Sequence, residues 1–263
     1  MMTFVAFWNA LNEMAAKDKQ EYFSKQECLS FRDFNIVDRY KVFQIPKRNS
    51  MGHSYRTIQA PSLRLKLFLR YANTILYKTY LVDNNCSFGF IKGKNVVMNA
   101  YQHINKKYVC NLDLKDFFPS ILYKKALTSA IKHINNVDIS ILELCIKASC
   151  VQTSNSIHLA QGSPLSPYLA NIVCKELDEK LQNLCINRGF SYSRYADDIT
   201  FSTDDHTIES INSFLDEAKG IIEREDFFIN NKKTRIQSKY YNQSVTGITV
   251  NEHPNVKKTF IKD

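Results

Sequence analysis

The sequence has little of the material that builds linkers, fibres or membrane spans. It contains only 7 Gly and 6 Pro among 263 residues, which excludes collagen-like and linker-rich architectures. No apolar run approaches the roughly 18 residues that a membrane-spanning helix needs. The apolar N-terminus lacks the basic segment of a signal peptide, and Phe4, Trp8 and Leu11 recur at helical spacing, which predicts an amphipathic helix. We therefore expect a folded cytoplasmic protein of one or two domains with no membrane contact.

Closely paired cysteines are also missing. The seven cysteines include no C-x-x-C pair, and the nearest two are Cys145 and Cys150. Zinc sites usually show tighter pairs. We therefore expect reduced and mostly buried thiols, as is usual in the cytoplasm.

Acidic residues are absent from one long stretch of the chain. The sequence has 35 Lys and Arg against 26 Asp and Glu, a net charge of +9. No Asp or Glu occurs from Arg39 to Val82, so the whole excess of positive charge lies there. Such a segment is typical of proteins that bind a polyanion, and the alternative is a solvated basic face without a ligand. The nine basic residues of this segment are Arg39, Lys41, Lys47, Arg48, Arg56, Arg64, Lys66, Arg70 and Lys78.

The hydrophobic patterns predict helices and strands without a βαβ rhythm, which favours an α+β fold. Tyr40 to Ile58 is predicted to form a basic β-hairpin or two short strands. Ser62 is a candidate N-cap of a mostly buried helix that runs to about Leu81. The other expected elements are helix and loop in residues 1–35, strands at 108–114 and 244–250, a hairpin at 190–202, and helices at 122–134, 138–149 and 207–224, with one more from Ser166 on that buries Leu169, Val173, Leu177, Leu181 and Leu184.

Three aspartates occupy unusual positions. Asp113 lies within an apolar strand, where a charge is costly unless it is paired or bound to a metal ion. Asp197 and Asp198 form the tip of the predicted hairpin, where aspartate alone more often means ordinary turn chemistry. Carboxylates that converge from neighbouring strands repel one another unless divalent cations neutralise them. Mg²⁺ binds carboxylates together with substrate phosphates, and two such ions are the usual clamp for in-line phosphoryl transfer.

Several segments, in this order, resemble the motifs of reverse transcriptases. NLDLKDFFPSI (111–121) is similar to their first metal-binding motif, and QGSPLSPYLAN (161–171) to the loop that contacts template and nucleotide. SRYADDITFS (193–202) resembles their catalytic hairpin, FQIPKRNSMGHSYRTIQAPSLRLK (43–66) the fingers segment that holds the triphosphate, and NNKKT (230–234) the late-palm lysine motif. The resemblance covers roughly residues 35–262 and implies an RNA-directed DNA polymerase with a right-hand fold.

The resemblance also implies roles for individual residues. Asp113, Asp197 and Asp198 would hold two Mg²⁺ ions, with Asp113 and Asp197 as the stronger ligands. Lys233 would protonate the leaving pyrophosphate, and its rival interpretation is a solvated lysine beside Lys232. Phe118 would be the steric gate that selects deoxynucleotides, and its rival interpretation is an ordinary core phenylalanine. The implied nucleotide-binding residues are Lys47, with Lys41 and Arg48 as competitors, Arg56, Phe118, Gln161 and Gly162.

Two further pieces resemble the retron branch of bacterial reverse transcriptases in particular. These are the Asn-Ala-x-x-His of residues 99–103 and the Val-Thr-Gly of residues 245–247, followed by Asn251. The retron resemblance implies a structured noncoding RNA as template and primer, dNTP substrates, an RNA–DNA hybrid product, and an effector protein as a possible partner in anti-phage defence. The implied nucleic-acid-binding residues are Arg48, Lys92, Lys94, Asn99, His103, Val245, Thr246 and Gly247.

The implied organisation is an N-terminal helical segment (1–35) and fingers (36–107, with a part that returns within 122–160). A palm (108–243) follows, with an antiparallel sheet packed on helices. Residues 244–263 would end the palm and start a truncated thumb. Ala160 stands where the family usually has proline, which should loosen the following loop without removing chemistry.

Three other functions stay open on the sequence alone. One is another bacterial reverse transcriptase, related to introns, diversity elements or abortive infection; the retron-like pieces oppose it. A second is an RNA-dependent RNA polymerase, which Phe118 and the Tyr195-Ala196 pair disfavour. The third is a non-catalytic RNA-binding scaffold, which has no need to concentrate three carboxylates.

Overall fold

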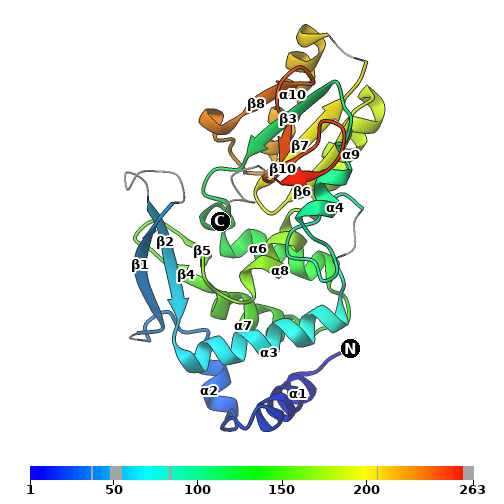
Figure 1. The fold of residues 1–263 in the computed structure, drawn as a ribbon. Coiled ribbons are helices and arrows are strands. Elements are labelled where there is room, and N and C mark those ends of the chain that lie inside the picture. Colours follow the sequence, from blue (N-terminus) through cyan, green and yellow to red (C-terminus); the bar gives the residue numbers. More distant parts are fainter. Residues whose placement is uncertain (37, 48–54, 83–84, 206, 257–263) are drawn as a thin grey trace. The chain divides into compact units, whose positions relative to one another are not determined.

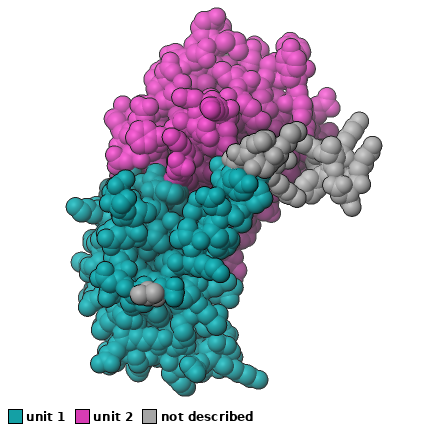
Figure 2. All heavy atoms as spheres, turned by 90° about the vertical axis from the view of Figure 1, so that its left-hand side faces the viewer, with its two compact units in different colours: residues 1–82, 118–173 teal, residues 83–117, 174–263 magenta. Residues whose placement is uncertain are grey.

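The computed structural model describes residues 1–36, 38–47, 55–82, 85–205 and 207–256 (Figure 1). The chain divides into two compact units, and each is described by itself (Figure 2). Unit 1 comprises Met1–Val82 and Phe118–Val173, and unit 2 comprises Asp83–Phe117 and Cys174–Asp263. Each unit is therefore built from two separate stretches of sequence.

Unit 1 is mainly helical, and its core lies between α1, α3 and α7. Phe7 of α1 and Phe68 of α3 are fully buried and pack edge to face at 6.2 Å. The predicted basic hairpin is confirmed, because β1 and β2 pair antiparallel from Tyr40–Pro61 to Pro46–Tyr55. The elements of unit 1 are α1 (Phe4–Lys17), α2 (Lys25–Ser30), β1 (Tyr40–Pro46), β2 (Tyr55–Pro61), α3 (Leu63–Thr79), α6 (Tyr123–His133), α7 (Ile139–Ser149), β4 (Cys150–Gln152), β5 (Ile157–Leu159) and α8 (Ser166–Val173), and α5 (Phe117–Ser120) crosses from unit 2.

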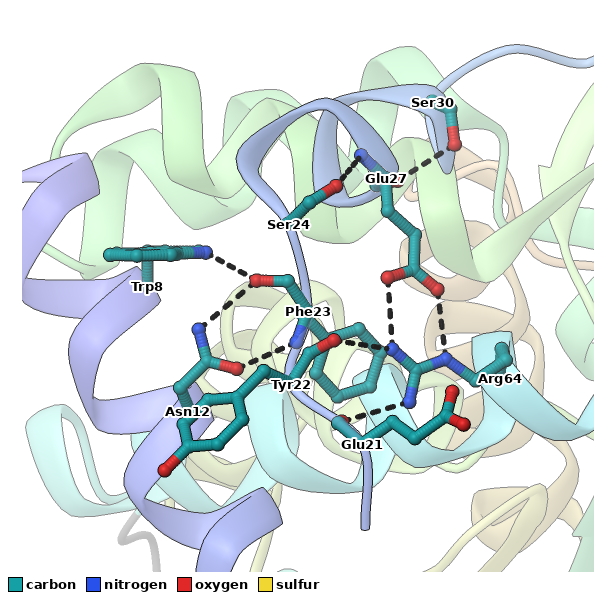
Figure 3. A network of polar contacts seen from close by, with 9 residues as sticks. All are labelled: Trp8, Asn12, Glu21, Tyr22, Phe23, Ser24, Glu27, Ser30 and Arg64. Atoms are coloured by element: carbon teal, nitrogen blue, oxygen red, sulfur yellow. Dashed lines mark hydrogen bonds and ion pairs between the residues drawn. The ribbon is translucent and has the colours of Figure 1, made fainter.

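Two arginines of the acid-free segment serve the structure of unit 1. Arg64 donates to both carboxylate oxygens of Glu27, at 2.8 and 2.9 Å, and to the carbonyls of Glu21 and Tyr22 (Figure 3). The same guanidinium lies 3.9 Å from the centre of the Phe23 ring. Arg39 is buried and donates to the carbonyl of Lys147. The basic surface expected from the sequence is therefore smaller than nine residues.

Unit 2 contains a four-stranded antiparallel sheet in the order β6-β7-β3-β8. Helices pack on it, as predicted: Phe214 of α10 contacts the ring of Phe201 of β7 at 5.0 Å, and both are fully buried. The elements of unit 2 are α4 (Val96–Tyr101), β3 (Tyr108–Asp113), α9 (Lys175–Arg188), β6 (Ser191–Tyr195), β7 (Asp198–Thr203), α10 (Ile208–Arg224), the 3₁₀ helix η1 (Asn231–Lys233), β8 (Arg235–Ser238), β9 (Ser244–Val245), β10 (Ile248–Thr249) and β11 (Asn255–Val256).

Two predicted elements differ in the structure. The helix expected from Ser166 onward is interrupted at Cys174, which separates α8 from α9. The single strand expected over 244–250 is instead two short strands joined by Thr246 and Gly247, whose φ angles are +49° and +87°. The prediction of one strand came from apolar residues that alternate on both sides of this turn. It was wrong because positive φ angles at two successive residues reverse the direction of the chain.

The predictions for cysteines and membrane contact can also be compared with the structure. All seven cysteines are buried thiols, as expected. Within the part of the chain that the structure describes, none of the helices combines the length and apolar character that a bilayer crossing requires.

Candidate active site

Strand register brings Asp113 and Asp198 together in unit 2. β3 and β7 are antiparallel neighbours, and their register pairs Asp113 with Asp198 and Leu112 with Ile199. Leu112 and Ile199 are 1% and 0% exposed, so that face of the strands is the core face. Since directly opposed residues share one face of a sheet and successive residues alternate, the two carboxylates lie together on the other face.

The third aspartate lies in the turn between β6 and β7. Tyr195 pairs with Asp198, which leaves Ala196 and Asp197 as a two-residue turn. The backbone N–H of Leu114, directly after β3, donates to the carbonyl of Asp197 at 2.9 Å. The structure therefore gathers the predicted catalytic aspartates at adjacent strand ends, and it opposes Asp113 to Asp198 rather than to Asp197.

Lys233 contacts the same carboxylate cluster. It ends η1, and its Nζ lies 2.5 Å from Oδ1 of Asp113. Asn230 holds the other side of Asp113, because its backbone N–H donates to the Asp113 carbonyl at 2.8 Å and its amide donates to Oδ2 at 3.3 Å. The predicted late-palm lysine thus contacts one of the predicted metal ligands.

The electrostatics of the cluster raise one carboxyl pKa. Burial, followed by the nearby charges of Asp197 and Asp113, raises the pKa of Asp198 from 3.8 to about 6, while Lys233 and Arg235 oppose this rise. A carboxylate crowded by two others favours the binding of a cation. An open cavity of about 450 Å³ adjoins the cluster and is lined by Asn111, Leu112, Asp113, Asp198, Lys232, Lys233, Arg235, Thr246 and Gly247.

The donor chemistry of the cluster fits Mg²⁺. Among the described residues no three His, Cys, Asp or Glu side chains are already arranged as a metal site, and Lys233 neutralises Asp113. The carboxylates of Asp113, Asp197 and Asp198 are nevertheless hard oxygen donors that repel one another, and Mg²⁺ takes few protein carboxylates and completes its shell with water or phosphate. These three aspartates would hold the ions.

Two predicted nucleotide-binding residues lie on a loop of unit 1 that docks against β2. The backbone N–H of Gln161 donates to Oε1 of Gln59, and the N–H of Gln59 donates to the carbonyl of Gln161, both at 2.9 Å. Gly162 has φ +145°, and a Cβ there would lie 2.4 Å from the Gln59 carbonyl oxygen. Arg56 is exposed on β2, the strand against which this loop docks.

The next fingers candidate is Lys47. Lys47 is exposed and directly follows β1. Arg48 lies outside the described residues.

The two adjacent phenylalanines differ in environment. Phe117 is 5% exposed and stacks on Phe227 at 6.0 Å, as a core residue does. Phe118 is only half-buried. Phe117 is therefore a core residue, and the role of Phe118 as the steric gate stays a prediction.

The two retron-like pieces meet in unit 2. The Asn99 amide donates to Oγ1 of Thr246 at 2.8 Å, and Ala100 and Val245 belong to one buried cluster. Both pieces therefore shape the turn that carries Thr246 and Gly247 to the cavity. Asn99 and Val245 are themselves 1% and 0% exposed, so neither is available to a nucleic acid as predicted.

His103 requires a correction. Its ring is fully buried, and its two nitrogens lie 2.8 Å from Oγ of Ser202 and 2.7 Å from Oγ of Ser193. Burial lowers the pKa of His103 to about 3. A neutral, buried ring in this position is not available to a nucleic acid, so His103 acts on the arrangement of the sheet instead.

The remaining predicted contacts lie on the segment before α4. Lys92 is exposed. Lys94 donates to the carbonyl of Ser87 at 3.0 Å and lies 5.1 Å from the centre of the Phe88 ring, so it also stabilises its own loop.

Sequence reasoning missed Gln59, Asn230 and Arg235. Arg235 begins β8 and lines the cavity beside the aspartates. A basic residue directly after the NNKKT segment was the available signal for Arg235. Gln59 and Asn230 lie within the recognised segments 43–66 and 230–234, but their roles were missed because they depend on contacts over 102 and 117 positions of the sequence.

Comparison with known proteins shows which family this chain resembles. The family described as reverse transcriptase (RNA-dependent DNA polymerase) matches residues 45–250. Retron Mx65 reverse transcriptase of Myxococcus xanthus is 34% identical over 228 residues, which cover 82% of this chain and 52% of that protein. Retron Ec83 and Ec86 reverse transcriptases of Escherichia coli are 32% and 33% identical over 84% and 86% of this chain, and 73% and 68% of those proteins. The chain thus spans about half of the first relative and about two thirds to three quarters of the others.

Solved structures with a similar fold include telomerases. Telomerase from Candida albicans gives a TM-score of 0.54 at 15% identity, over 81% of this chain and 45% of that one. Telomerase from Candida tropicalis gives 0.55 at 13% identity, over 85% and 46%. At such identities the likeness concerns the fold alone, and it confirms the predicted α+β right-hand polymerase fold. The chain belongs to the reverse transcriptase family, and within that family to the retron type.

Proposed function

We propose that this chain is an RNA-directed DNA polymerase that copies RNA by two-metal-ion nucleotidyl transfer. The observation that carries the proposal is the carboxylate cluster of unit 2, in which the register opposes Asp113 to Asp198 and the turn adds Asp197. Burial, together with this crowding of carboxylates, raises the pKa of Asp198 to about 6. A non-catalytic scaffold has no use for this arrangement.

The residues of the site suggest how each contributes to the reaction. Two Mg²⁺ ions, when bound, would supply Lewis-acid stabilisation of the attacking and leaving oxygens. Asp113, Asp197 and Asp198 would hold and orient these ions. Lys233, which contacts Asp113 at 2.5 Å, would give a proton to the leaving pyrophosphate oxygen. Asn230 keeps Asp113 in position through its two hydrogen bonds.

Nucleotide selection is assigned to unit 1. The half-buried ring of Phe118 leaves no space for a ribose 2′-OH, which selects deoxynucleotides. Arg56 and Lys47 neutralise the triphosphate, since arginine can contact phosphate oxygens with two N–H groups at once. The docked loop of Gln161 and Gly162 supports the nascent base pair.

The retron relationship supports a more specific role. We infer that a structured noncoding RNA serves as template and primer, that the product is an RNA–DNA hybrid, and that the enzyme works in the cytoplasm with an effector protein in anti-phage defence. The nucleic-acid contacts proposed for this RNA are Lys92, Gly247, Thr246 and the exposed cations of the acid-free segment.

The test of the polymerase is primer extension with dNTPs and Mg²⁺ on a primed RNA template. Asp197→Asn removes a negative ligand, and we expect the extension rate to fall by about 10³-fold or more because the metal ions supply most of the transition-state stabilisation. Asp205→Asn, an exposed aspartate in the loop after β7, is the matched control and should extend like the wild type. Circular dichroism establishes that both variants are folded. Wild-type extension by Asp197→Asn would refute the assignment.

A further inference from the structure

A buried ion pair in unit 2 contacts the turn of Ala196 and Asp197 between β6 and β7. Arg194 of β6 and Asp178 of α9 are both fully buried, and Arg194 is the largest fully buried side chain among the residues that the structure describes. Nε and Nη2 of Arg194 donate to Oδ1 and Oδ2 of Asp178 at 2.7 and 2.8 Å. The Tyr192 hydroxyl also donates to Oδ1 at 2.7 Å. A buried pair is rarely more stable than apolar side chains of equal volume, so stability alone does not account for this one.

The guanidinium also holds the backbone of the turn. Nη1 of Arg194 donates to the carbonyl oxygen of Ala196 at 3.0 Å, and Nη2 donates to Oγ of Ser87 at 3.2 Å. The Ala196 carbonyl belongs to the peptide that joins Ala196 to Asp197, which is the central peptide of the two-residue turn. A bond to this oxygen therefore restrains the backbone that carries the Asp197 carboxylate.

The orientation of this peptide decides the conformation of Asp197. Two-residue hairpin turns of types I′ and II′ both need a positive φ at the first residue, but only type I′ needs one at the second. Ala196 has φ +58°, whereas the φ of Asp197 is not positive, which corresponds to the II′ pattern. Aspartate tolerates positive φ more readily than most residues, so rotation of the central peptide to the other turn is sterically open to this sequence.

Further contacts hold the turn on other sides. The Leu114 N–H donates to the Asp197 carbonyl at 2.9 Å. Gly89 approaches so closely that a Cβ there would lie 2.4 Å from the Ala196 nitrogen. Type II′ turns prefer glycine at the first position, and alanine there is strained. The observed turn therefore depends on support from outside itself.

We propose that Arg194, held in place by Asp178, is a positioning residue that keeps the Ala196–Asp197 peptide in the orientation that directs Asp197 to the metal-binding cluster. The proposal rests on the proposed function of this cluster. Asp178 acts through Arg194. Its carboxylate binds Nε and Nη2 of the guanidinium, which leaves Nη1 to donate to the Ala196 carbonyl.

The decisive variant replaces the pair by apolar residues of similar volume, Arg194→Met with Asp178→Leu. This change removes the bond to Ala196 without leaving an unpaired buried charge, so the fold should persist. We expect Mn²⁺ binding, followed by electron paramagnetic resonance, to weaken by about 10- to 100-fold, as for other residues that orient metal ligands. The Mg²⁺ concentration needed for half-maximal primer extension should rise in parallel. A folded double variant that binds Mn²⁺ like the wild type would overturn the proposal.

A second variant covers the case in which the double variant does not fold. Arg194→Lys keeps a cation beside Asp178 but loses the planar fork that reaches Asp178 and Ala196 together, so it should show the same weakening of Mn²⁺ binding. Normal binding by Arg194→Lys would refute the role of the guanidinium. Phe214→Leu, a fully buried residue of α10, is the control: it should lower stability in urea and leave Mn²⁺ affinity unchanged. If the wild type binds Mn²⁺ but does not extend primers, the proposed function fails while the positioning role is still measured.

Discussion

Two adjacent phenylalanines lie in different environments. Phe117 is buried against Phe227, whereas Phe118 is half-buried. We predict that Phe118→Ala raises ribonucleotide incorporation relative to deoxynucleotide incorporation, because the 2′-OH is no longer excluded. Phe117→Ala should instead lower the free energy of unfolding by about 3–5 kcal/mol. Competition between rNTPs and dNTPs in primer extension, together with urea denaturation, measures both effects. Exchanged phenotypes would place the gate one residue earlier.

The raised pKa of Asp198 predicts how stability depends on pH. Because the folded state binds this proton more tightly than the unfolded chain, its contribution to stability is present below pH 3.8 and is lost as the pH rises through about 6. We expect the metal-free protein to lose up to about 3 kcal/mol over this range from this group. Added Mg²⁺ should therefore stabilise the protein more at pH 8 than at pH 5, where it competes with the proton.

Urea denaturation at the two pH values, with and without Mg²⁺, checks this dependence. Asp198→Asn should be more stable than the wild type at pH 8 without metal and should respond less to Mg²⁺. Asp205→Asn is the exposed control and should follow the wild type. An equal Mg²⁺ effect at both pH values in the wild type would contradict the predicted linkage.

Among the structural elements, the loop of Gln161 and Gly162 shows how a motif depends on its neighbour. The loop can dock on β2 only if residue 162 has no side chain, because a Cβ at Gly162 would lie 2.4 Å from the Gln59 carbonyl oxygen. We predict that Gly162→Ala lowers the free energy of unfolding by about 2–4 kcal/mol, since overpacking adds to the strain of a positive φ, and that it raises the KM for dNTPs.

The matched control for Gly162→Ala is Gly93→Ala. Gly93 also has a positive φ, +85°, but a Cβ there would meet nothing within 4 Å. Only the backbone strain of about 1–2 kcal/mol should appear, with no change in KM. Equal stability losses in the two variants would show that the contact with Gln59 is unimportant.

For the chain as a whole, the distribution of charge predicts salt-dependent binding of RNA. Of the nine basic residues in the acid-free segment, Arg39 is buried and Arg64 is engaged by Glu27. The exposed cations are therefore the ones that can release counterions from RNA. We predict that reversing Lys41, Lys66 and Arg70 to Glu flattens the slope of log K against log salt, because each lost phosphate contact reduces it by about 0.7–0.9.

Filter binding or fluorescence anisotropy between 50 and 200 mM salt, roughly the range in which such contacts differ most, measures this slope. Lys17→Glu with Lys19→Glu reverses charges of unit 1 outside the segment and is the control. A slope that changes equally in both variants would indicate that net charge, rather than this segment, governs binding.

Patterns along the chain were sufficient for much of this protein. Periodic apolar residues predicted the helices α3, α6, α7 and α10 and the strands β3, β6 and β7 to within a few residues, because these elements depend on which face is buried. The motifs around Asp113, Gln161 and Asp197 were recognisable because each is contiguous. The strand expected at 244–250 was wrong, since alternation does not reveal the positive φ angles of Thr246 and Gly247.

Contacts between distant residues arose only on folding. The register that opposes Asp113 to Asp198, the ion pair of Lys233 with Asp113, and the hydrogen bond of Arg194 to Ser87 join segments that no local pattern connects. Burial also removed His103 from the set of surface residues. Register and burial follow from the free energy of packing whole elements together. The sequence therefore shows which chemical groups are present, and tertiary packing decides which of them come into contact.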